Sequence, residues 1–278
     1  MMNYVRNQTI DETSLYSFHF GFERNFDVRA GKQWFKYKWH HCIYYIFAYL
    51  ILIYGGQKYM KNRPPFNMKP LLIIWNLVLC TFHTLAAIRI LPEFIYALYY
   101  FGFTYSICRS THVELKTTTF WNLMFLWCKV PELFDTAFLI FRKRKIIFMH
   151  WFHHAVSLFV CWYIASEPNA VSRWYSSMNL AVHSLMYGYY AVTSMQISMP
   201  KFVPMFVTTM QILQMILATF VTVWSFVYFK LYRTCELTES RIYVALFIYT
   251  LYCYLFVRFF YNAYLQKSIS KKKVSHME

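Results

Sequence analysis

Charged residues are scarce in this sequence. Only 14% of the 278 residues are Asp, Glu, Lys or Arg, whereas 58% are hydrophobic; a soluble domain usually carries about 25% charged residues. The apolar residues stand in long blocks and do not alternate with polar ones. Roughly 20 mainly apolar residues span a bilayer as a helix, and the blocks are too continuous for barrel strands. The sequence therefore predicts an all-α integral membrane protein.

Acidic residues are especially few. Asp and Glu number 12 against 28 Lys and Arg, which gives a net charge of +16. In a soluble protein this excess would suggest a nucleic-acid partner. The basic residues cluster instead in short segments between apolar blocks, where cytoplasmic loops are expected. We therefore expect the lipid bilayer as a partner and no nucleic acid.

Paired cysteine motifs are also absent. The seven cysteines include no C-x-x-C pair, and most lie in apolar runs. Such an odd, scattered set does not predict a disulfide framework. No cleavable signal peptide is recognisable, because the first forty residues are polar and the first long apolar block begins near His41.

Seven apolar blocks predict a bundle of seven transmembrane helices. They cover residues 41–57, 70–92, 119–141, 146–166, 172–195, 202–229 and 241–265. The segment 93–118 is only partly apolar and predicts an interfacial or re-entrant helix. The chain thus divides into three parts: a polar tail (1–40), a seven-helix membrane domain (41–266) and a basic tail (267–278).

The predicted loops orient this bundle, because cytoplasmic loops carry the excess of Lys and Arg. One side holds Lys58, Lys61, Arg63, Lys69, Arg142, Lys143, Arg144, Lys145, Lys201, Lys267 and Lys271 to Lys273. The opposite loops hold fewer, namely Arg109, Lys116, Arg173, Lys230, Arg233 and Arg241. We therefore expect a cytosolic C-terminus and a lumenal N-terminus. Asn7 begins an N-x-S/T sequon in that lumenal tail and is a glycosylation candidate.

Polar side chains occur inside four consecutive predicted spans, where they are costly and tend to mark functional sites. The third and fourth spans carry Lys129, Glu132, Asp135 and Thr136, and then His150, His153 and His154. A structural ion-pair ladder explains the third-span group equally well. The i, i+3, i+4 spacing of the histidines points three imidazoles to one side. That cluster predicts either metal ligation or acid–base and nucleophilic chemistry.

The next two spans repeat the pattern at steps of three and four residues. They carry Asn179, His183, Met186, Tyr187 and Tyr190, and then Thr208, Gln211 and Gln214. Amides in spans often only bond neighbouring helices. Four inward polar stripes nevertheless have to meet, so we expect one polar chamber inside the bundle with the histidines at its centre.

These motifs resemble those of the very-long-chain fatty-acid elongases, the ELO family of 3-ketoacyl-CoA synthases. The family patterns K-x-x-E-x-x-D-T, H-x-x-H-H, N-x-x-V-H-x-x-M-Y-x-Y-Y and T-x-x-Q match residues 129–136, 150–154, 179–190 and 208–211, with Gln214 following. The resemblance covers roughly residues 40–266. Trp151, next to the first histidine of the box, resembles the branch that handles saturated and monounsaturated chains.

The resemblance implies an endoplasmic-reticulum enzyme that condenses a long-chain acyl-CoA with malonyl-CoA. The products would be 3-ketoacyl-CoA, CO2 and CoA, and the acyl tail would lie in an apolar tunnel between spans. It also implies no bound cofactor or metal. The expected partners are the 3-ketoacyl-CoA reductase, 3-hydroxyacyl-CoA dehydratase and enoyl-CoA reductase of the cycle. The tail segment 271–273 resembles a basic retrieval signal, although five residues follow it.

Such a reaction needs a group that carries the acyl chain. No cysteine stands within a polar motif, and histidine can form covalent acyl intermediates, so we expect His153 to be the carrier. His150 and His154 would orient it or move protons. His183 would act as a base or polarise the thioester carbonyl.

The remaining motif residues would bind and stabilise the substrates. Asn179 and Gln211 are amide donors suited to the enolate oxygen. The other supporting residues are Lys129, Glu132, Asp135, Tyr187, Tyr190 and Gln214. The basic run Arg142, Lys143, Arg144 and Lys145 would either meet CoA phosphates or serve only as a topology signal.

Two other functions fit parts of the pattern. A membrane di-iron desaturase or hydroxylase also has histidine boxes, but only His150, His153, His154 and His183 stand in plausible ligand positions, whereas His83 and His112 are isolated. A seven-helix receptor or transporter would not need the triple histidine, and no broken-helix repeat suggests a transporter.

Overall fold

The structure is a computed structural model that describes residues 10–266. Within that range the regular elements are all helical. They are α1 (Glu12–Leu15), α2 (Gly21–Arg24), α3 (Val28–Lys38), η2 (Trp39–His41), α4 (Cys42–Met60), α5 (Lys69–Cys108), η3 (Thr111–Val113), α6 (Lys116–Cys128), η4 (Pro131–Leu133), α7 (Phe134–Phe141), α8 (Phe148–Ala165), α9 (Ser172–Ser194), α10 (Phe202–Tyr232), α11 (Glu239–Phe260) and η5 (Tyr261–Leu265). Asn7 and the segment 271–273 lie outside the described residues.

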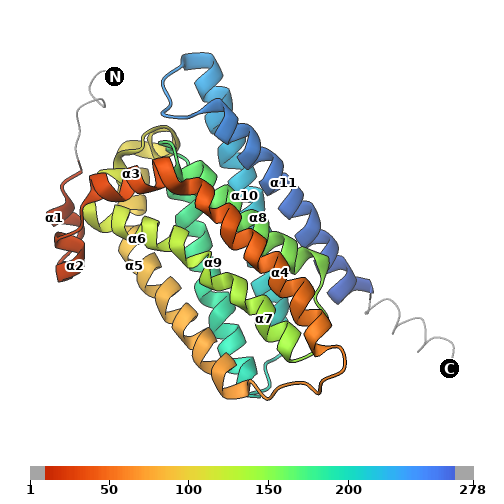
Figure 1. Cartoon of the computed structure of the whole chain (residues 1–278). Coiled ribbons are helices and arrows are strands. Elements are labelled where there is room, and N and C mark those ends of the chain that lie inside the picture. The colour runs from red at the N-terminus through yellow and green to blue at the C-terminus, as the bar shows by residue number, and fades with distance from the viewer. Residues whose placement is uncertain (1–9, 267–278) are drawn as a thin grey trace.

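The long helices lie side by side, and their connections fall at two ends of the bundle (Figure 1). α5 packs along α9, α10 along α11, and α4 against α7 and α8. The amino end carries α1 to α3 and the α5–α6, α8–α9 and α10–α11 connections (Figure 1). The basic end carries the α4–α5, α7–α8 and α9–α10 connections and includes the run 142–145.

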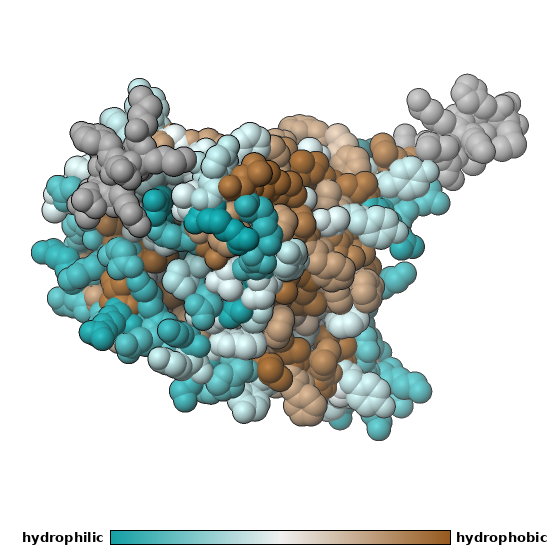
Figure 2. All heavy atoms as spheres, turned by 90° about the horizontal axis from the view of Figure 1, so that it is seen from above, coloured by the Kyte–Doolittle hydropathy of each residue, from teal (hydrophilic) through white to brown (hydrophobic). Residues whose placement is uncertain are grey.

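Among residues 10–266, three helices are, by length and composition, apolar enough to cross a membrane: Lys69–Cys108, Phe202–Tyr232 and Glu239–Leu265. Their outer faces expose large apolar side chains such as Ile88, Phe220 and Phe247. Figure 2 shows a broad hydrophobic area beside a hydrophilic one on the same face of the molecule. An apolar surface of this extent requires contact with lipid or with another protein.

The predicted apolar blocks all fall on helices. The prediction of a separate interfacial or re-entrant helix after the second block is wrong. Residues 93–108 do not form a separate interfacial helix, because α5 continues past Pro92 to Cys108. The helix is interrupted at Gly102 instead, where φ is 84°. Only glycine adopts this backbone conformation without a steric cost. The kink in α5 therefore lies at Gly102, ten residues beyond Pro92.

The third predicted span is not one helix. α6 ends at Cys128 and α7 begins at Phe134, with a short 3₁₀ turn from Pro131 between them. Proline lacks the backbone N–H and clashes with the preceding turn, so it ends a helix. The break places Lys129 at the C-terminus of α6 and Asp135 in the first turn of α7. Both charges suit the helix dipoles at those positions.

Residues 10–40, expected to be a polar tail, form α1 to α3 and pack against the amino end. The Glu12 carboxylate accepts hydrogen bonds from the backbone N–H groups of Lys116 (3.0 Å) and Thr117 (2.5 Å). These bonds cap α6, which has no capping side chain of its own. Glu23 forms a buried ion pair with Arg89 of α5 at 2.6 Å. The segment is therefore held by charge-assisted bonds, a role that its polar composition did not reveal.

A disulfide joins Cys108, at the end of α5, to Cys235 in the α10–α11 connection. The expectation that the cysteines form no disulfide framework is thus wrong for this pair, because the two thiols, 127 residues apart, meet only in the fold. Glu236 accepts hydrogen bonds from the backbone of Ser110 (2.8 Å), from its hydroxyl, and from Arg109 (3.0 Å). Burial raises the pKa of Glu236, but these donors outweigh it and hold the pKa below its ordinary value.

Arg173, counted above among the loop charges, lies instead in α9 and is fully buried. Its guanidinium donates to the buried Glu93 carboxylate of α5 at 2.9 to 3.1 Å. It also donates to the carbonyls of Ser106 (2.8 Å) and Arg109 (2.9 Å). One cation thus ties α9 to α5 and to the connection after α5.

Replacing this cation should destabilise the protein strongly. Arg173→Met leaves the Glu93 carboxylate buried without a partner, which costs about 3–5 kcal/mol of unfolding free energy. Thermal unfolding in detergent would show a large drop in melting temperature. The control is Lys230→Met, which removes a half-exposed pair with Glu239 and should leave the melting temperature nearly unchanged. Equal effects of the two variants would contradict this account of Arg173.

Candidate active site

A cavity of about 940 Å³ extends from the amino end into the bundle. Its inner end is lined by polar side chains from five helices or their ends: Lys129, His153, Ser157, Asn179, Gln214 and Tyr252. Its outer end is lined by residues of α3 and of the α5–α6 and α8–α9 connections, among them Lys32, His112, Glu114 and Asn169. Several residues predicted to form a polar chamber, among them Lys129, His153, Asn179 and Gln214, therefore line the inner end of this cavity.

The walls of the cavity differ in chemistry. α8, α10 and α11 contribute the apolar Val160, Ile164, Met215 and Ile248. α6 contributes Thr119 and Asn122 beside the apolar Leu123, Phe125 and Leu126, and α9 contributes Ser172 and Ser176. The predicted apolar tunnel is thus apolar along only part of its wall. At the outer end, burial and the charges of Arg173 and Lys32 lower the pKa of His112 well below its ordinary value.

An ion pair lies where α6 breaks. Lys129 donates to Oε1 of Glu132 at 2.7 Å and to Oδ1 of Asn179, on α9, at 3.1 Å. Both charged side chains are almost completely buried. The ammonium therefore links two of the predicted motifs. Because an ammonium only donates, it binds the Asn179 oxygen and leaves the Asn179 amide N–H groups available.

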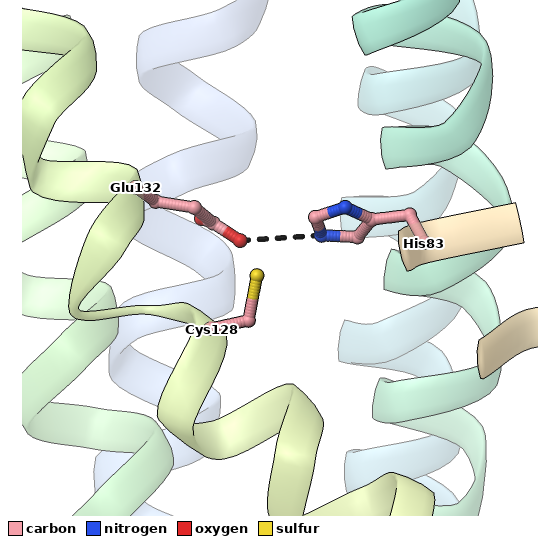
Figure 3. A group of neighbouring side chains, drawn as sticks. All are labelled: His83, Cys128 and Glu132. Carbon is pink, nitrogen blue, oxygen red and sulfur yellow. Dashed lines mark hydrogen bonds and ion pairs between the residues drawn. The ribbon is translucent and has the colours of Figure 1, made fainter. Parts of the chain in front are cut away.

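His83 of α5 also reaches Glu132 and was missed by the sequence motifs. Figure 3 shows its imidazole facing the Glu132 carboxylate, with Cys128 beside the pair. His83 Nε2 lies 3.2 Å from Glu132 Oε1, and Nδ1 lies 2.8 Å from the Leu79 carbonyl oxygen. The one available signal was its place in an apolar block, because an ionisable residue within a span suggests function.

His83, Cys128 and Glu132 offer three potential metal-ligand atoms within 4.8 Å of one another. The Glu132 oxygen in this group already accepts the Lys129 ammonium at 2.7 Å. A metal ion at this point would stand against a buried positive charge. The donor set is therefore better described as part of an ion-pair network than as a metal site.

The three histidines of the box do not all face the same way. His150 Nε2 is 3.1 Å from the Thr136 hydroxyl, which bonds Tyr49 at 2.6 Å. His154 Nε2 lies 4.0 Å from Asp135 Oδ2. His150 and His154 thus face α7, whereas His153 faces the cavity and α11. The expectation of one shared direction is wrong, since i+3 and i+4 positions lie on opposite sides of the i position of a helix.

His153 is held from one side and free on the other. Its ring packs on Tyr252, with the centroids 4.6 Å apart, and Tyr252 donates to the His153 carbonyl at 3.2 Å. Nε2 lies 3.5 Å from the Ser157 hydroxyl. Nδ1 is buried and finds no hydrogen-bond partner among the described residues. An imidazole nitrogen is thus available at the inner end of the cavity.

His183 presents a second such nitrogen. Its Nδ1 is buried, lacks a hydrogen-bond partner within residues 10–266, and lies 3.8 Å from Glu132 Oε1. Its ring lies against His83, with centroids 5.2 Å apart, and near Tyr187 at 5.8 Å. Tyr187 in turn donates to Asp135 at 2.8 Å. The first and third motifs, residues 129–136 and 179–190, are therefore joined through the side chains of α9.

Asp135 is held by two neutral donors. Trp75 Nε1 donates to one oxygen at 2.7 Å, and the Tyr187 hydroxyl donates to the other. Tyr190, by contrast, is 41% exposed and meets the group only through the Tyr187 ring, at 6.2 Å. Trp75, like His83, belongs to α5 and was not among the predicted site residues.

The two amides of α10 have different surroundings. Gln214 is buried and lines the cavity. Gln211 directs its amide to the Met186 sulfur at 3.2 Å and does not line the cavity. Of the two, Gln214 is therefore the better placed to meet a substrate.

The basic run lies apart from these groups, at the basic end. Arg142 lines a second, polar hollow of about 420 Å³ with Lys69, Thr193, Ser194 and Gln196. Lys143 donates to the Lys61 carbonyl at 3.1 Å. Along α8 and α9 the histidines stand between this hollow and the large cavity.

Comparison with known proteins gives a consistent result. The family model described as GNS1/SUR4, or ELO, matches residues 34–272. The chain is 37% identical over 262 residues to the Drosophila melanogaster very long chain fatty acid elongase 6, covering 93% of this chain and 83% of that protein. It is 38% identical over 259 residues to the Caenorhabditis elegans putative fatty acid elongase 4, covering 93% and 89%.

A human relative agrees. Very long chain fatty acid elongase 3 of Homo sapiens is 33% identical over 256 residues, covering 92% of this chain and 93% of that protein. The matches extend over the four motifs, the cavity and the apolar helices described above. The chain therefore belongs to the GNS1/SUR4 family, the very-long-chain fatty-acid elongases.

Proposed function

We infer that this membrane protein is the condensing enzyme of fatty-acid elongation. It joins a long-chain acyl-CoA to malonyl-CoA and yields 3-ketoacyl-CoA, CO2 and CoA. Its family membership carries the assignment. The geometry supports it through one observation in particular: at the inner end of a long, partly apolar cavity stands His153, whose Nδ1 has no hydrogen-bond partner within the part of the chain that the structure describes.

We propose that seven helical segments cross the endoplasmic-reticulum membrane: α4, α5, α6 with α7, α8, α9, α10 and α11. The amino end would face the lumen. The disulfide Cys108–Cys235 at that end supports this orientation, because the lumen is oxidising. The basic end would face the cytosol, as the excess of Lys and Arg in its loops favours.

We propose that the substrate lies along the bundle axis. The CoA phosphates would meet Arg142 and Lys69 at the basic end, and the thioester would lie among the histidines. The acyl tail would fill the large cavity, which follows α8 from His153 to Ser166. Thirteen residues of helix correspond to about 20 Å, a length suited to a long acyl chain.

In the first half-reaction we propose that His153 Nδ1 attacks the thioester carbonyl. Before the attack Nδ1 holds the lone pair and Nε2 the proton, and the Nε2–H group can donate a hydrogen bond to the Ser157 hydroxyl at 3.5 Å. Collapse of the tetrahedral intermediate breaks the C–S bond and releases the CoA thiolate, which takes up a proton. An acyl-imidazole remains.

In the second half-reaction malonyl-CoA loses CO2, and the resulting enolate carbon attacks the acyl-imidazole, restoring His153. The free amide N–H of Asn179 would donate to the enolate oxygen, together with Gln214. His183, whose Nδ1 is unpartnered, would polarise the thioester carbonyl or move a proton. His150 and His154 would hold the box through Thr136 and Asp135.

We further propose that the enzyme needs no bound cofactor or metal. It would act on saturated and monounsaturated chains, as Trp151 suggests. It would hand its product to a 3-ketoacyl-CoA reductase, with the 3-hydroxyacyl-CoA dehydratase and enoyl-CoA reductase completing the cycle. These assignments rest on the resemblance of the motifs to the family.

The acyl carrier can be tested directly. Incubation with a long-chain acyl-CoA alone should release free CoA and add one acyl mass to the intact protein. His153→Ala should abolish the adduct and reduce condensation by roughly 10³-fold or more, since a nucleophile is lost. Cys161→Ser replaces a cavity-lining thiol and should keep the adduct. Intact-protein mass spectrometry measures each case. An adduct that persists in His153→Ala would show that another group carries the acyl chain.

Topology provides a second test. Tags at the two termini, examined by protease access in sealed microsomes, should show a protected N-terminal tag and a digested C-terminal tag. Removing the sequon with Asn7→Gln, if the sequon is used, lowers the apparent mass by one glycan. Protection of the C-terminal tag would reverse the proposed orientation.

Metal independence provides a third test. Purified enzyme dialysed against a strong chelator should retain condensation activity within about twofold, because the Glu132 oxygen beside His83 and Cys128 already accepts the Lys129 ammonium, whose charge would repel a metal ion. Elemental analysis of the same sample checks the composition. Stoichiometric metal whose removal abolishes activity would contradict the proposal.

A further inference from the structure

We propose that Ser157 and Tyr252 are positioning residues that hold the imidazole of His153 as the tautomer whose Nδ1 carries the lone pair. All three side chains line the inner end of the large cavity. His153 and Ser157 stand one turn apart on α8, whereas Tyr252 belongs to α11, a helix from which no site residue was predicted. The inference rests on the proposed function, because it concerns how the proposed acyl carrier is prepared for its attack.

The three side chains form a cyclic network of hydrogen bonds. His153 Nε2 lies 3.5 Å from the Ser157 hydroxyl, and that hydroxyl lies 3.0 Å from the Tyr252 hydroxyl. The Tyr252 hydroxyl in turn lies 3.2 Å from the backbone carbonyl oxygen of His153, which can only accept. The first of these links is the longest and therefore the weakest. The network thus starts at the His153 imidazole and returns to the His153 backbone, and Nδ1 is the ring nitrogen outside it.

The protons of the network can point in two directions. In the first direction Nε2–H donates to Ser157, Ser157 donates to Tyr252, and Tyr252 donates to the carbonyl oxygen. All three protons then have acceptors, and only the lone pair of Nδ1 lacks a partner among residues 10–266. In the opposite direction Tyr252 donates to Ser157 and Ser157 donates to Nε2, so the imidazole proton lies on Nδ1.

The opposite direction leaves more groups unsatisfied. A buried Nδ1–H group would then have no acceptor within the described part of the chain, and the His153 carbonyl oxygen would lose the Tyr252 proton. A buried donor without an acceptor is costly, and orphaned N–H groups are rare in folded proteins. The first direction is therefore favoured, and in it Nδ1 has the free lone pair that a nucleophile needs.

Packing against α11 holds the plane of the same imidazole. The His153 ring centroid lies 4.6 Å from that of Tyr252 and 5.8 Å from that of Phe256. Both aromatic side chains are almost completely buried, so a rotation of the imidazole has to displace one of them or break the hydrogen bonds. A nucleophile held in one orientation avoids the loss of rate that misplacement causes.

Loss of either hydroxyl should therefore slow the first half-reaction without weakening the binding of acyl-CoA. Without the network, the imidazole proton is shared between the two nitrogens, and a smaller fraction of the enzyme has a free lone pair on Nδ1. The expected loss of rate is about tenfold, which corresponds to one net hydrogen bond between neutral groups.

The first experiment measures how fast the intact protein gains one acyl mass from saturating acyl-CoA in the absence of malonyl-CoA. Tyr252→Phe and Ser157→Val should each lower this rate about tenfold and change the apparent affinity for acyl-CoA less than about threefold. Ser157→Thr has a hydroxyl where Ser157→Val has a methyl group, and it should keep the rate within about threefold of the wild type. The control Tyr243→Phe removes the hydroxyl of an exposed tyrosine elsewhere on α11 and should match the wild type.

The double variant Ser157→Val/Tyr252→Phe distinguishes one shared network from two separate effects. Either substitution alone breaks the network, so the double variant should be at most about twofold slower than the slower single variant. Losses that multiply to about a hundredfold would overturn the proposal. A wild-type rate in Tyr252→Phe would overturn it as well.

A spectroscopic measurement tests the network without the reaction. NMR of isotope-labelled histidine nitrogens, with the His153 signals identified by their loss in His153→Gln, should show the proton on Nε2 in the wild type. In Tyr252→Phe the signals should move toward those of a mixture of tautomers. A proton on Nδ1 in the wild type would refute the proposal. A proton on Nε2 in an enzyme that forms no acyl adduct would uphold the network and refute the proposed acyl carrier.

Discussion

The ion pair between Lys129 and Glu132 determines how the interior of this bundle is arranged. Charges in an apolar interior persist only when paired and hydrogen-bonded. The two residues stand three apart, on either side of the break before Pro131 and Glu132, and Lys129 Nζ lies 2.7 Å from Glu132 Oε1. Asn179 from α9 and His83 from α5 then complete its hydrogen bonds. Three helices thus converge on one carboxylate and its ammonium, and the histidines pack around them.

Because unpaired charges are costly in an apolar interior, charged and neutral polar groups lie at different depths along the bundle axis. Groups that stay charged and solvated, such as Arg142 and Lys69, lie at the basic end beside a polar hollow. His153, the proposed acyl carrier, lies deeper, and its buried Nδ1 has no hydrogen-bond partner among residues 10–266. Beyond His153 the cavity is lined in part by apolar side chains of α8, α10 and α11. A CoA thioester has its phosphates, reactive carbonyl and tail in this same order.

Much of this arrangement could be predicted from the sequence, because lipid-facing helices need long apolar blocks and those blocks are visible in the residues. The histidine box was predicted for the same reason, as a costly exception within a block. The break of the third predicted span was missed, although Pro131 stands at it, whereas Pro92 lies inside helix α5. The i, i+3, i+4 spacing already separates His153 from His154 around the helix, but the groups that each histidine contacts depend on the neighbouring helices.

Contacts between distant residues could not be predicted. His83 and Glu132 are 49 residues apart, and no pattern in either segment refers to the other. Two other contacts also join distant segments: Glu12 caps the start of α6, and Glu23 forms an ion pair with Arg89. The polar composition of residues 10–40 fits a solvated tail as well as it fits a segment packed on the bundle. Such contacts depend on how helices pack in three dimensions.

The disulfide between Cys108 and Cys235 has a consequence for how the chain is made. It closes a covalent ring that holds α6, α7, α8, α9 and α10, and with them every motif residue from Lys129 to Gln214. In the proposed orientation both thiols reach the lumen only if the chain between them crosses the bilayer an even number of times. A chain in which one of these segments fails to insert leaves Cys235 in the reducing cytosol. In the proposed orientation the disulfide therefore forms during biosynthesis only when the chain between Cys108 and Cys235 has crossed the bilayer an even number of times.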